Sequence, residues 1–235
     1  LFPYTTLFRS PIPYPGLTPG AGEIQRLADN LPKRISVHAY KTDTPCVWIV
    51  FAGGTGTGKS TLFNAACGRP LSGTGVERPR TGGPIAFAPR RCAVGEGFPL
   101  PSVRIDRRAP QVILRQPAIG APGELLVLEH EGENWRQAVM VDTPDLDSVQ
   151  EENRRSAEDM GLLADAIVFV SSQEKYSDEV PYRFLESAAR EGKEIFFVLN
   201  KAHGEWTKSD LAESFRVQGV LLPEERIWFL PYFPA

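Results

Sequence analysis

The residues best suited to chemistry are the glycine-rich run GGTGTGKS at positions 53–60. This run satisfies the pattern G-x-x-x-x-G-K-S/T, in which glycines let backbone N–H groups approach a phosphate closely. Lys59 would reach the β- and γ-phosphates as a flexible cation, and the Ser60 hydroxyl would take one position on a magnesium ion. The pattern predicts a nucleoside triphosphate site. The alternative is an ordinary glycine loop before a helix.

The flanking sequence predicts that this loop joins a buried strand to a helix. Residues 46–52 (CVWIVFA) are apolar throughout, which is typical of a parallel strand buried on both faces. The run KSTLFNAAC, from Lys59, has a helical pattern that ends near Gly68. A helix N-terminus directs N–H groups at an anion. We therefore expect these residues at the nucleotide: Gly53, Gly54, Thr55, Gly56, Thr57, Gly58, Lys59, Ser60 and Thr61.

A carboxylate that could complete a magnesium site is Asp142, which follows the apolar stretch QAVMV. An aspartate that ends a buried strand is the usual second protein contact of the metal in P-loop proteins. The alternative is a turn-forming aspartate before Thr143 and Pro144. The apolar strand in front of Asp142 favours the metal role.

The rest of the chain predicts an α/β fold. Strands are expected at residues 84–88, 102–105, 111–114, 124–128, 137–141, 166–170, 194–199 and 226–230, and helices at 149–163, 179–191 and 208–217. After Asp142, strands and helices alternate at the spacing of right-handed crossovers. We therefore predict a three-layer P-loop NTPase fold, similar to a Ras-like G domain, with a mainly parallel central sheet.

The N-terminal part predicts little globular structure. The first ten residues resemble translated sequencing adapter and are excluded from the fold prediction, and the proline- and glycine-rich residues 11–22 predict an extended leader. Helical spacing follows at residues 23–31. We expect a disordered, partly non-native leader at 1–20, a helix and connection at 21–45, and a GTPase domain at 46–235 that is truncated at its C-terminus.

The net charge and the cysteines bear on the partners, the metal sites and the cellular location to be expected. The net charge is −3, so no global basic field argues for nucleic acid or anionic lipid. Three cysteines (Cys46, Cys67 and Cys92) show no metal-ligand spacing and indicate neither a disulfide framework nor a zinc site. We expect buried apolar thiols and a cytoplasmic location, with peripheral membrane attachment open for a longer form. No apolar run is long enough for a spanning helix.

Four ordered motifs resemble those of the translation-factor-related GTPases, especially the Era, EngA and dynamin-like groups, over residues 46–231. They are GGTGTGKSTLFNAACG, ERPRTGGPIAF, VMVDTPD and FVLNKAH. The resemblance implies a magnesium-dependent GTPase switch that binds GTP and GDP. It also implies that Thr81 holds magnesium and the attacking water, that Lys59 and Thr81 are catalytic, that Ser60, Thr81 and Asp142 hold the metal, and that Asn200 and Lys201 contact the nucleotide.

Two positions depart from the pattern of these groups. Asp145 stands where they have glycine, and its carboxylate would either repel a triphosphate or point outward. His203 stands where they have the aspartate that accepts two hydrogen bonds from guanine, and a neutral imidazole accepts one. GTPase activity is therefore predicted alongside two alternatives: a nucleotide-binding scaffold with little hydrolysis, and an ATPase with relaxed base specificity.

Turnover is expected to be slow without help. The water-orienting glutamine of small GTPases has no match, and Leu146 stands in its place. An activating protein or a homodimer is therefore an expected partner. Nine arginines lie between residues 69 and 115, where a solvated face is the default. Contact with RNA or a membrane surface, through this region or a missing C-terminal segment, remains open, as does a finger-like role for Arg78 or Arg80.

Overall fold

The computed structural model describes residues 21–44, 46–74, 82–109, 116–175, 179–204 and 206–231. Its centre is one sheet that contains β1 Val47–Gly53, β2 Ile85–Pro89, β3 Arg104–Arg108, β4 Glu124–His130, β5 Ala138–Asp142, β6 Ala166–Ser172, β7 Glu194–Ala202 and β8 Ile227–Pro231. The strand order is β3-β4-β2-β5-β1-β6-β7-β8. Every neighbouring pair in this order is parallel except β2 with β5.

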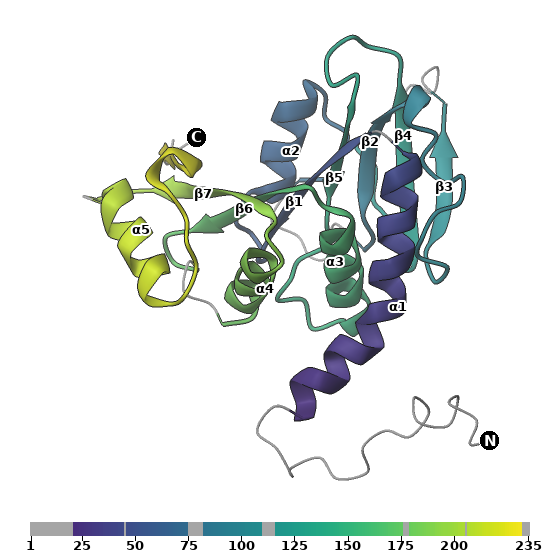
Figure 1. Ribbon diagram of the computed structural model, residues 1–235. Coiled ribbons are helices and arrows are strands. Elements are labelled where there is room, and N and C mark those ends of the chain that lie inside the picture. The colour runs from purple at the N-terminus through teal and green to yellow at the C-terminus, as the bar shows by residue number, and fades with distance from the viewer. Residues whose placement is uncertain are drawn as a thin grey trace, which may run out of the picture.

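Helices cover both faces of the sheet (Figure 1). They are α1 Ala21–Asp43, α2 Lys59–Cys67, α3 Glu151–Leu163, α4 Glu179–Arg190 and α5 Lys208–Val217, with short 3-10 segments η2 Arg90–Cys92 and η3 Glu224–Arg226. Phe63 of α2 joins one hydrophobic cluster, with Phe51 and Met140. The other four helices contribute to a second cluster, through residues such as Val37, Met160, Leu185 and Phe215. Two cores separated by one sheet confirm the predicted three-layer α/β fold with a mainly parallel sheet.

The parallel register places several strand ends at one edge of the sheet. Phe51 near the end of β1 pairs with Asp142 at the end of β5, and Ser172 at the end of β6 pairs with Asn200 of β7. Ligands of open α/β sheets bind outside the carboxyl ends of the strands. The site residues predicted from the sequence should therefore lie together at this edge.

Local sequence signals predicted some elements closely and others less well. α5 spans Lys208–Val217 as expected, and a capping box between Thr207 and Asp210 defines its start. The strand expected at 102–105 lies instead at Arg104–Arg108. The strand expected at 111–114 and the leader at 1–20 lie outside the described residues.

α1 is much longer than the helix predicted at 23–31, and it continues through Pro32. A proline inside a helix removes a hydrogen bond and favours a break. Tertiary contacts offset this cost: Lys33 pairs with Asp159 at 2.6 Å, and Arg34 pairs with Glu191 at 2.6 Å. Further along, Val37 and Tyr40 are buried in the core. The extension thus depends on packing that the local sequence does not reveal.

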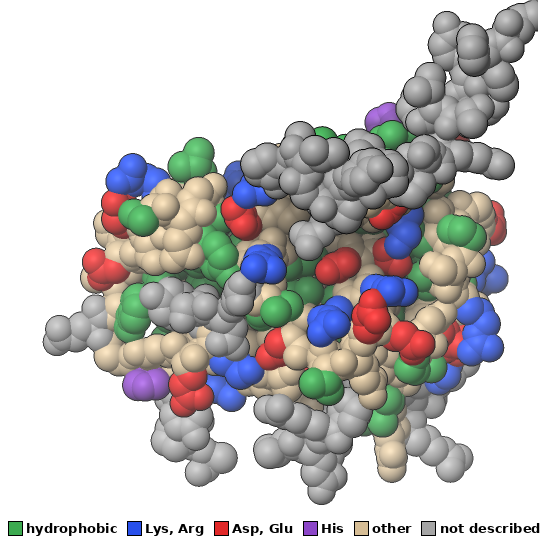
Figure 2. All heavy atoms as spheres, turned by 90° about the horizontal axis from the view of Figure 1, so that it is seen from below, with side chains coloured by type: hydrophobic (Ala, Val, Ile, Leu, Met, Phe, Trp, Pro, Cys, Tyr) green, Lys and Arg blue, Asp and Glu red, His purple; other side chains and the backbone are tan. Residues whose placement is uncertain are grey.

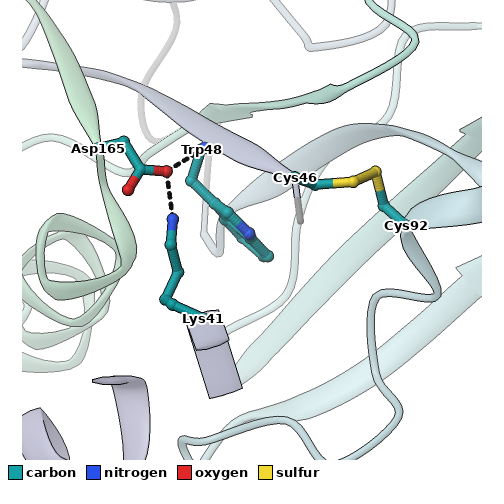
Figure 3. Close-up of a disulfide and its surroundings, with 5 residues drawn as sticks. All are labelled: Lys41, Cys46, Trp48, Cys92 and Asp165. Atoms are coloured by element: carbon teal, nitrogen blue, oxygen red, sulfur yellow. Dashed lines mark hydrogen bonds and ion pairs between the residues drawn. A yellow bond between two sulfur atoms is a disulfide. The ribbon is translucent and has the colours of Figure 1, made fainter. Parts of the chain in front are cut away.

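The prediction that the cysteines form no disulfide was wrong. Cys46, just before β1, is bonded to Cys92 of η2, with Cα atoms 6.0 Å apart (Figure 3). The two residues are 46 positions apart, so only the packing of η2 beside the start of β1 brings them together. Nearby, Asp165 accepts hydrogen bonds from the Lys41 ammonium and from the Trp48 backbone at 2.7 Å. The disulfide ties the start of β1 to η2, and the ion pair ties the end of α1 to Asp165, just before β6.

Cys67 is the cysteine that the structure leaves as a free thiol. Burial raises its pKa to about 12, helped by the negative charge of Asp142, so the thiol stays protonated at neutral pH. The predicted role was that of a buried apolar thiol, and the structure places Cys67 half-buried rather than fully buried.

Within the described ranges, the helices lack the combined length and apolar character that crossing a membrane requires.

We predict that Tyr40→Ala lowers the free energy of unfolding by about 3 kcal/mol, because it removes a buried aromatic ring from the core. The ring packs edge-on against Trp48 and Phe98, at centroid distances of 6.4 and 5.9 Å. Urea denaturation measures the loss. The control is Ile35→Ala on the same helix, where the side chain is 62% exposed and the change should stay within about 0.5 kcal/mol. Equal losses in both variants would show that α1 does not dock through Tyr40.

Candidate nucleotide-binding site

The loop between β1 and α2 has the backbone conformation that its glycines permit. Gly56 and Gly58 have φ values of 73° and 95°, in the left-handed region that side chains disfavour. A Cβ on Gly58 would also lie 2.1 Å from Nδ2 of Asn200. Inside the loop, the buried Thr57 hydroxyl donates to the carbonyl of Gly54 at 2.9 Å. The loop is thus a fixed turn that leads directly into the N-terminus of α2.

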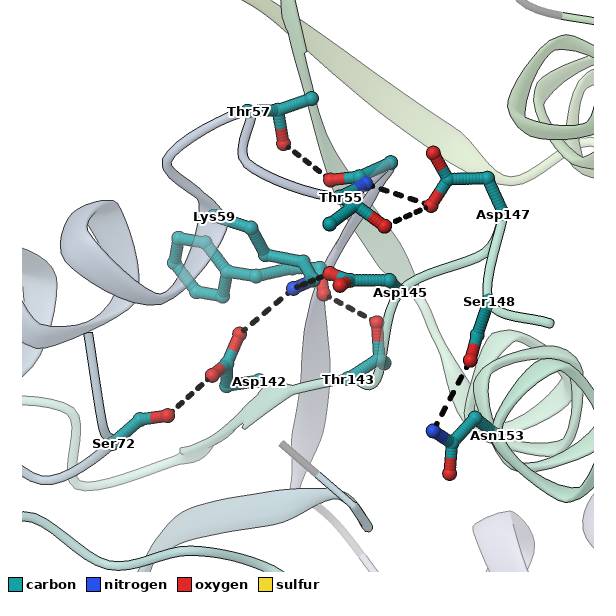
Figure 4. A network of polar contacts seen from close by, with 12 residues as sticks. Thr55, Thr57, Lys59, Ser72, Asp142, Thr143, Asp145, Asp147, Ser148 and Asn153 are labelled. Carbon is teal, nitrogen blue, oxygen red and sulfur yellow. Dashed lines mark hydrogen bonds and ion pairs between the residues drawn. The ribbon is translucent and has the colours of Figure 1, made fainter. Parts of the chain in front are cut away.

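Lys59 points from the first turn of α2 toward carboxylates at the end of β5 and on the segment after it (Figure 4). Its ammonium lies 3.1 Å from Asp145 and 3.8 Å from Asp142. The Lys59 side chain is 4% exposed and that of Asp142 is not exposed at all. Burial lowers the pKa of Lys59, but the negative charges of Asp142, Asp145 and Asp147 outweigh it and raise the pKa above its usual value. Lys59 is therefore a buried cation whose charged form is stabilised by the carboxylates around it.

Of the two carboxylate oxygens of Asp142, Oδ2 accepts a close hydrogen bond, whereas Oδ1 makes only the longer ion pair with Lys59. Ser72 donates to Oδ2 at 2.6 Å, and a hydrogen bond from Ser60 also stabilises the charged carboxyl. Oδ1 is buried and has no hydrogen-bond partner among the described residues. Burial raises the pKa of Asp142, although Lys59 and the two serines act in the opposite direction. A carboxylate oxygen that accepts no hydrogen bond, beside a serine hydroxyl, is the kind of oxygen ligand that Mg²⁺ prefers.

A second carboxylate binds the glycine loop itself. Oδ1 of Asp147 accepts hydrogen bonds from the backbone N–H of Thr55 at 2.7 Å and from its hydroxyl at 2.5 Å. Lys175 pairs with the other oxygen at 2.9 Å. Burial raises the pKa of Asp147, but the bonds from Thr55 and Lys175 prevail and hold the pKa below its usual value. Asp147 is therefore a carboxylate fixed against the loop.

The segment at the end of β7 closes over the loop from another side. Asn200 donates through Nδ2 to the carbonyl of Thr57 at 2.8 Å, and the Lys201 ammonium donates to the carbonyl of Gly56 at 3.0 Å. Nδ1 of His203 lies 3.1 Å from the Lys201 carbonyl oxygen. A carbonyl only accepts, so this contact requires the proton on Nδ1 and leaves Nε2 of the neutral ring as an acceptor.

The structure brings most of the predicted site residues together. Lys59, Ser60 and Asp142 are adjacent, and Asn200 and Lys201 contact the glycine loop. Thr61 is exposed on the first turn of α2. Thr81, expected at the metal, and the neighbouring Arg78 and Arg80 lie outside the described residues. Their roles, like those of the other site residues, remain predictions.

The sequence analysis missed several residues that organise this site. Ser72 supplies the closest hydrogen bond to Asp142, and Asn64 fixes Ser72 by accepting from its N–H and donating to its carbonyl, both at 2.8 Å. Asp147 and Lys175 were missed as well. Ser72 lies in a glycine-rich stretch with no motif, and Lys175 is 28 residues from its partner. No local signal marks them, although the position of Asp147 close after Asp142 could have drawn attention.

Asp145 does not point outward, which was one of its two predicted orientations. It makes the shorter of the two ion pairs of Lys59 that the structure describes. The glycine found here in the resembled groups would make no such contact.

The arginine-rich region carries less free positive charge than its composition suggests. Four of its arginines pair with carboxylates: Arg90 with Glu131, Arg104 with Glu124, Arg107 with Glu129 and Arg108 with Asp106. Acidic and basic side chains also lie intermixed on the face shown in Figure 2. These pairs favour the solvated-face interpretation for the described part of the region. Arg115 lies outside the described residues.

Comparisons with known proteins find a distant relative. The chain matches no protein-family profile. It is 29% identical over 193 residues to an uncharacterised protein encoded in the 3′ region of xynA in Caldicellulosiruptor sp. (strain Rt8B.4), covering 76% of this chain and 44% of that protein. The chain thus spans less than half the length of this relative.

Solved structures show a similar arrangement at low identity. Era in complex with MgGDPNP and nucleotides 1506–1542 of 16S ribosomal RNA is 14% identical, with 80% of this chain and 51% of that chain covered and a TM-score of 0.47. An oligomerised bacterial dynamin pair that senses and tethers membranes is 18% identical, with 89% and 43% covered and a TM-score of 0.48. The chain spans about half or less of each. At such low identities and TM-scores the likeness carries no argument about what this chain binds.

We predict that Gly58→Ala destabilises the protein more than Gly68→Ala, by more than about 1 kcal/mol. Both glycines cap α2 with positive φ, so both substitutions meet the same kind of backbone strain. Only the methyl group at residue 58 would collide with Asn200, whereas nothing lies within 4 Å of the Cβ position at residue 68. Urea denaturation of the two variants measures the difference. Similar losses would mean that Asn200 does not pack against the loop.

Proposed function

We propose that this chain binds a nucleoside triphosphate together with Mg²⁺ at the loop of residues 53–60 and hydrolyses GTP as a molecular switch. The observation that carries the proposal is the buried pair of Lys59 and Asp142, 3.8 Å apart at the edge where β1 and β5 end. Burying a charged pair costs free energy because both charges lose their hydration. Such pairs cluster at functional sites, so a buried pair beside a glycine loop indicates a site for a charged ligand.

The chain's own groups divide the work. The N-terminus of α2 and the backbone N–H groups of the loop bind the phosphates, and the ammonium of Lys59 stabilises the negative charge that develops during transfer. Ser60 and Asp142 would hold magnesium, with Asp142 Oδ1, which accepts no hydrogen bond among the described residues, as the ligand atom. When bound, the metal neutralises negative charge on the phosphate oxygens. Thr81 is the proposed holder of the attacking water.

The second part of the proposal concerns which base the site prefers. Asn200 and Lys201 contact the loop as a base-binding segment would need to, and His203 presents one acceptor at Nε2. Guanine offers two adjacent donor groups, so one acceptor leaves one donor underpaired. We therefore propose weaker discrimination between GTP and ATP than an aspartate at residue 203 would give.

A scaffold that binds nucleotide without hydrolysis is the second candidate. The observation in its favour is the ion pair between Asp145 and Lys59, which occupies the cation that transfer requires. An activating protein, a homodimer, RNA and a membrane surface are proposed partners of the hydrolysing form. A cytoplasmic location is proposed as well.

We predict that Lys59→Ala reduces phosphate release from GTP by about 100-fold or more, because it removes the cation nearest to the transferred group. The measurement is release of inorganic phosphate at saturating nucleotide and magnesium. Lys33→Ala also removes one cation, but from an ion pair with Asp159 on α3, and should leave the rate unchanged. Circular dichroism must show both variants folded, since Lys59→Ala leaves Asp142 without its charge partner. A wild-type rate no higher than that of Lys59→Ala would exclude hydrolysis and leave the scaffold function.

We predict that His203→Asp tightens GTP binding by about tenfold, because a carboxylate restores the second acceptor for guanine. The affinity for ATP should not rise, since adenine lacks the paired donors. Titration of fluorescent GTP, ATP and XTP against the wild type and the variant measures both effects. If the wild type binds ATP at least as tightly as GTP, the assignment of guanine is wrong. An unchanged GTP affinity in the variant would place His203 away from the base.

A further inference from the structure

Two carboxylates of this chain bind the same groups of the loop that, in the proposed function, would bind phosphate. Asp145 takes the ammonium of Lys59 at 3.1 Å, and Asp147 takes the backbone N–H and the hydroxyl of Thr55 (Figure 4). We propose that Asp145 and Asp147 form an internal latch on the phosphate loop, which a triphosphate must displace in order to bind. The inference rests on the proposed function, because it concerns the regulation of the same site.

The latch uses the same chemistry as the ligand. Each carboxylate presents anionic oxygens to a cation or an N–H group, as a phosphate would. The Lys59 side chain is 4% exposed and its ammonium lies against Asp145, so little of the ammonium is accessible to a phosphate. A triphosphate that entered while both aspartates remained in place would bring like charges together in a largely buried site, where water screens them little. Binding therefore requires the two carboxylates to leave.

Additional contacts hold the latch segment against the loop. Leu146, between the two aspartates, donates its N–H to the carbonyl of Gly53 at 3.2 Å. Before them, the Thr143 hydroxyl donates to the carbonyl of Phe51 at 2.9 Å. On the far side, Lys175 pairs with Asp147. Lys175 therefore acts as a positioning residue that keeps the Asp147 carboxylate on Thr55.

The segment is also able to open. Residues 143–148 belong to neither a helix nor a strand, so few regular hydrogen bonds resist their movement. The Asp145 side chain is 32% exposed and that of Asp147 19%, whereas Asp142 is fully buried. Asp142 can therefore stay in place while the other two carboxylates turn toward solvent. One segment thus carries a fixed carboxylate for the metal and two displaceable ones for the latch.

A purely structural role for the same contacts makes a different prediction. If Asp145 and Asp147 only stabilise the site, replacing either one should weaken both the fold and nucleotide binding. If they compete with phosphate, the two quantities should change in opposite directions. The protein without nucleotide should lose stability because Lys59 or Thr55 loses a partner, and its affinity for triphosphate should rise.

The test uses Asp145→Asn and Asp147→Asn in the full chain, which keep the side-chain size and remove the charge. Titration with labelled GTP, ATP and inorganic tripolyphosphate, each with magnesium, gives the affinities, and thermal unfolding without ligand gives the stability. We expect each substitution to tighten binding of all three ligands by about tenfold. We also expect the melting temperature without nucleotide to fall. Glu174→Gln removes one negative charge next to Lys175 in the chain without touching the latch and should change neither quantity.

The outcomes separate the latch from the proposed function. If the wild type binds the three ligands and both variants bind them equally well or more weakly, the latch is overturned and the proposed nucleotide site stands. A gain for only one base, or an equal gain in Glu174→Gln, also overturns it, since displacement from the phosphate loop depends on neither the base nor the general charge. If no protein binds any of the three ligands, both proposals fail. If one variant does not fold, the other decides, because each removes an independent contact.

Discussion

The arrangement of this site depends on the ion pairs that the Lys59 ammonium makes with the carboxylates of Asp142 and Asp145. A buried charge without a partner costs several kcal/mol, so the loop that carries Lys59 and the segment that carries the aspartates are bound to lie together. The ion pairs connect the start of α2 with the segment after β5, which are more than eighty residues apart in the chain. Ser72 and Ser60 then supply hydrogen bonds to the Asp142 carboxylate. Lys59 thus connects two segments, and Asp142 adds a third, the one that carries Ser72.

The sheet supplies the constraint that makes this enclosure possible. β5 and β6 both pair in parallel with β1, so the chain segments that leave these strands start from the same edge as the glycine loop. The absence of a side chain at Gly58 allows the amide of Asn200, from β7, to approach the loop closely. Strand order therefore decides which loops can reach the phosphate site, and the glycines decide how near they come.

The opposite end of the sheet is held by different means. The disulfide between Cys46 and Cys92 joins the start of β1 to η2, and the pair of Lys41 with Asp165 joins the end of α1 to the turn before β6. Both contacts lie away from the strand ends that carry the site. They stabilise the base of β1, whose far end carries the glycine loop. A rigid strand is a precise support for a binding loop.

The sequence by itself determined the elements that depend on local patterns. The apolar run of β1, the glycines and Lys59 after it, and the capped helix at Lys208–Val217 follow from spacing and local conformational preference, which need no distant partner. Asp142 could be placed because it ends an apolar strand. Only the tertiary structure decided the rest: that α1 continues through Pro32, that Cys46 and Cys92 are bonded, that Asp145 faces Lys59, and that Ser72 and Asp147 belong to the site. Each of these depends on a partner far away in the chain, and the energy of such a contact is decided by packing that no local window contains.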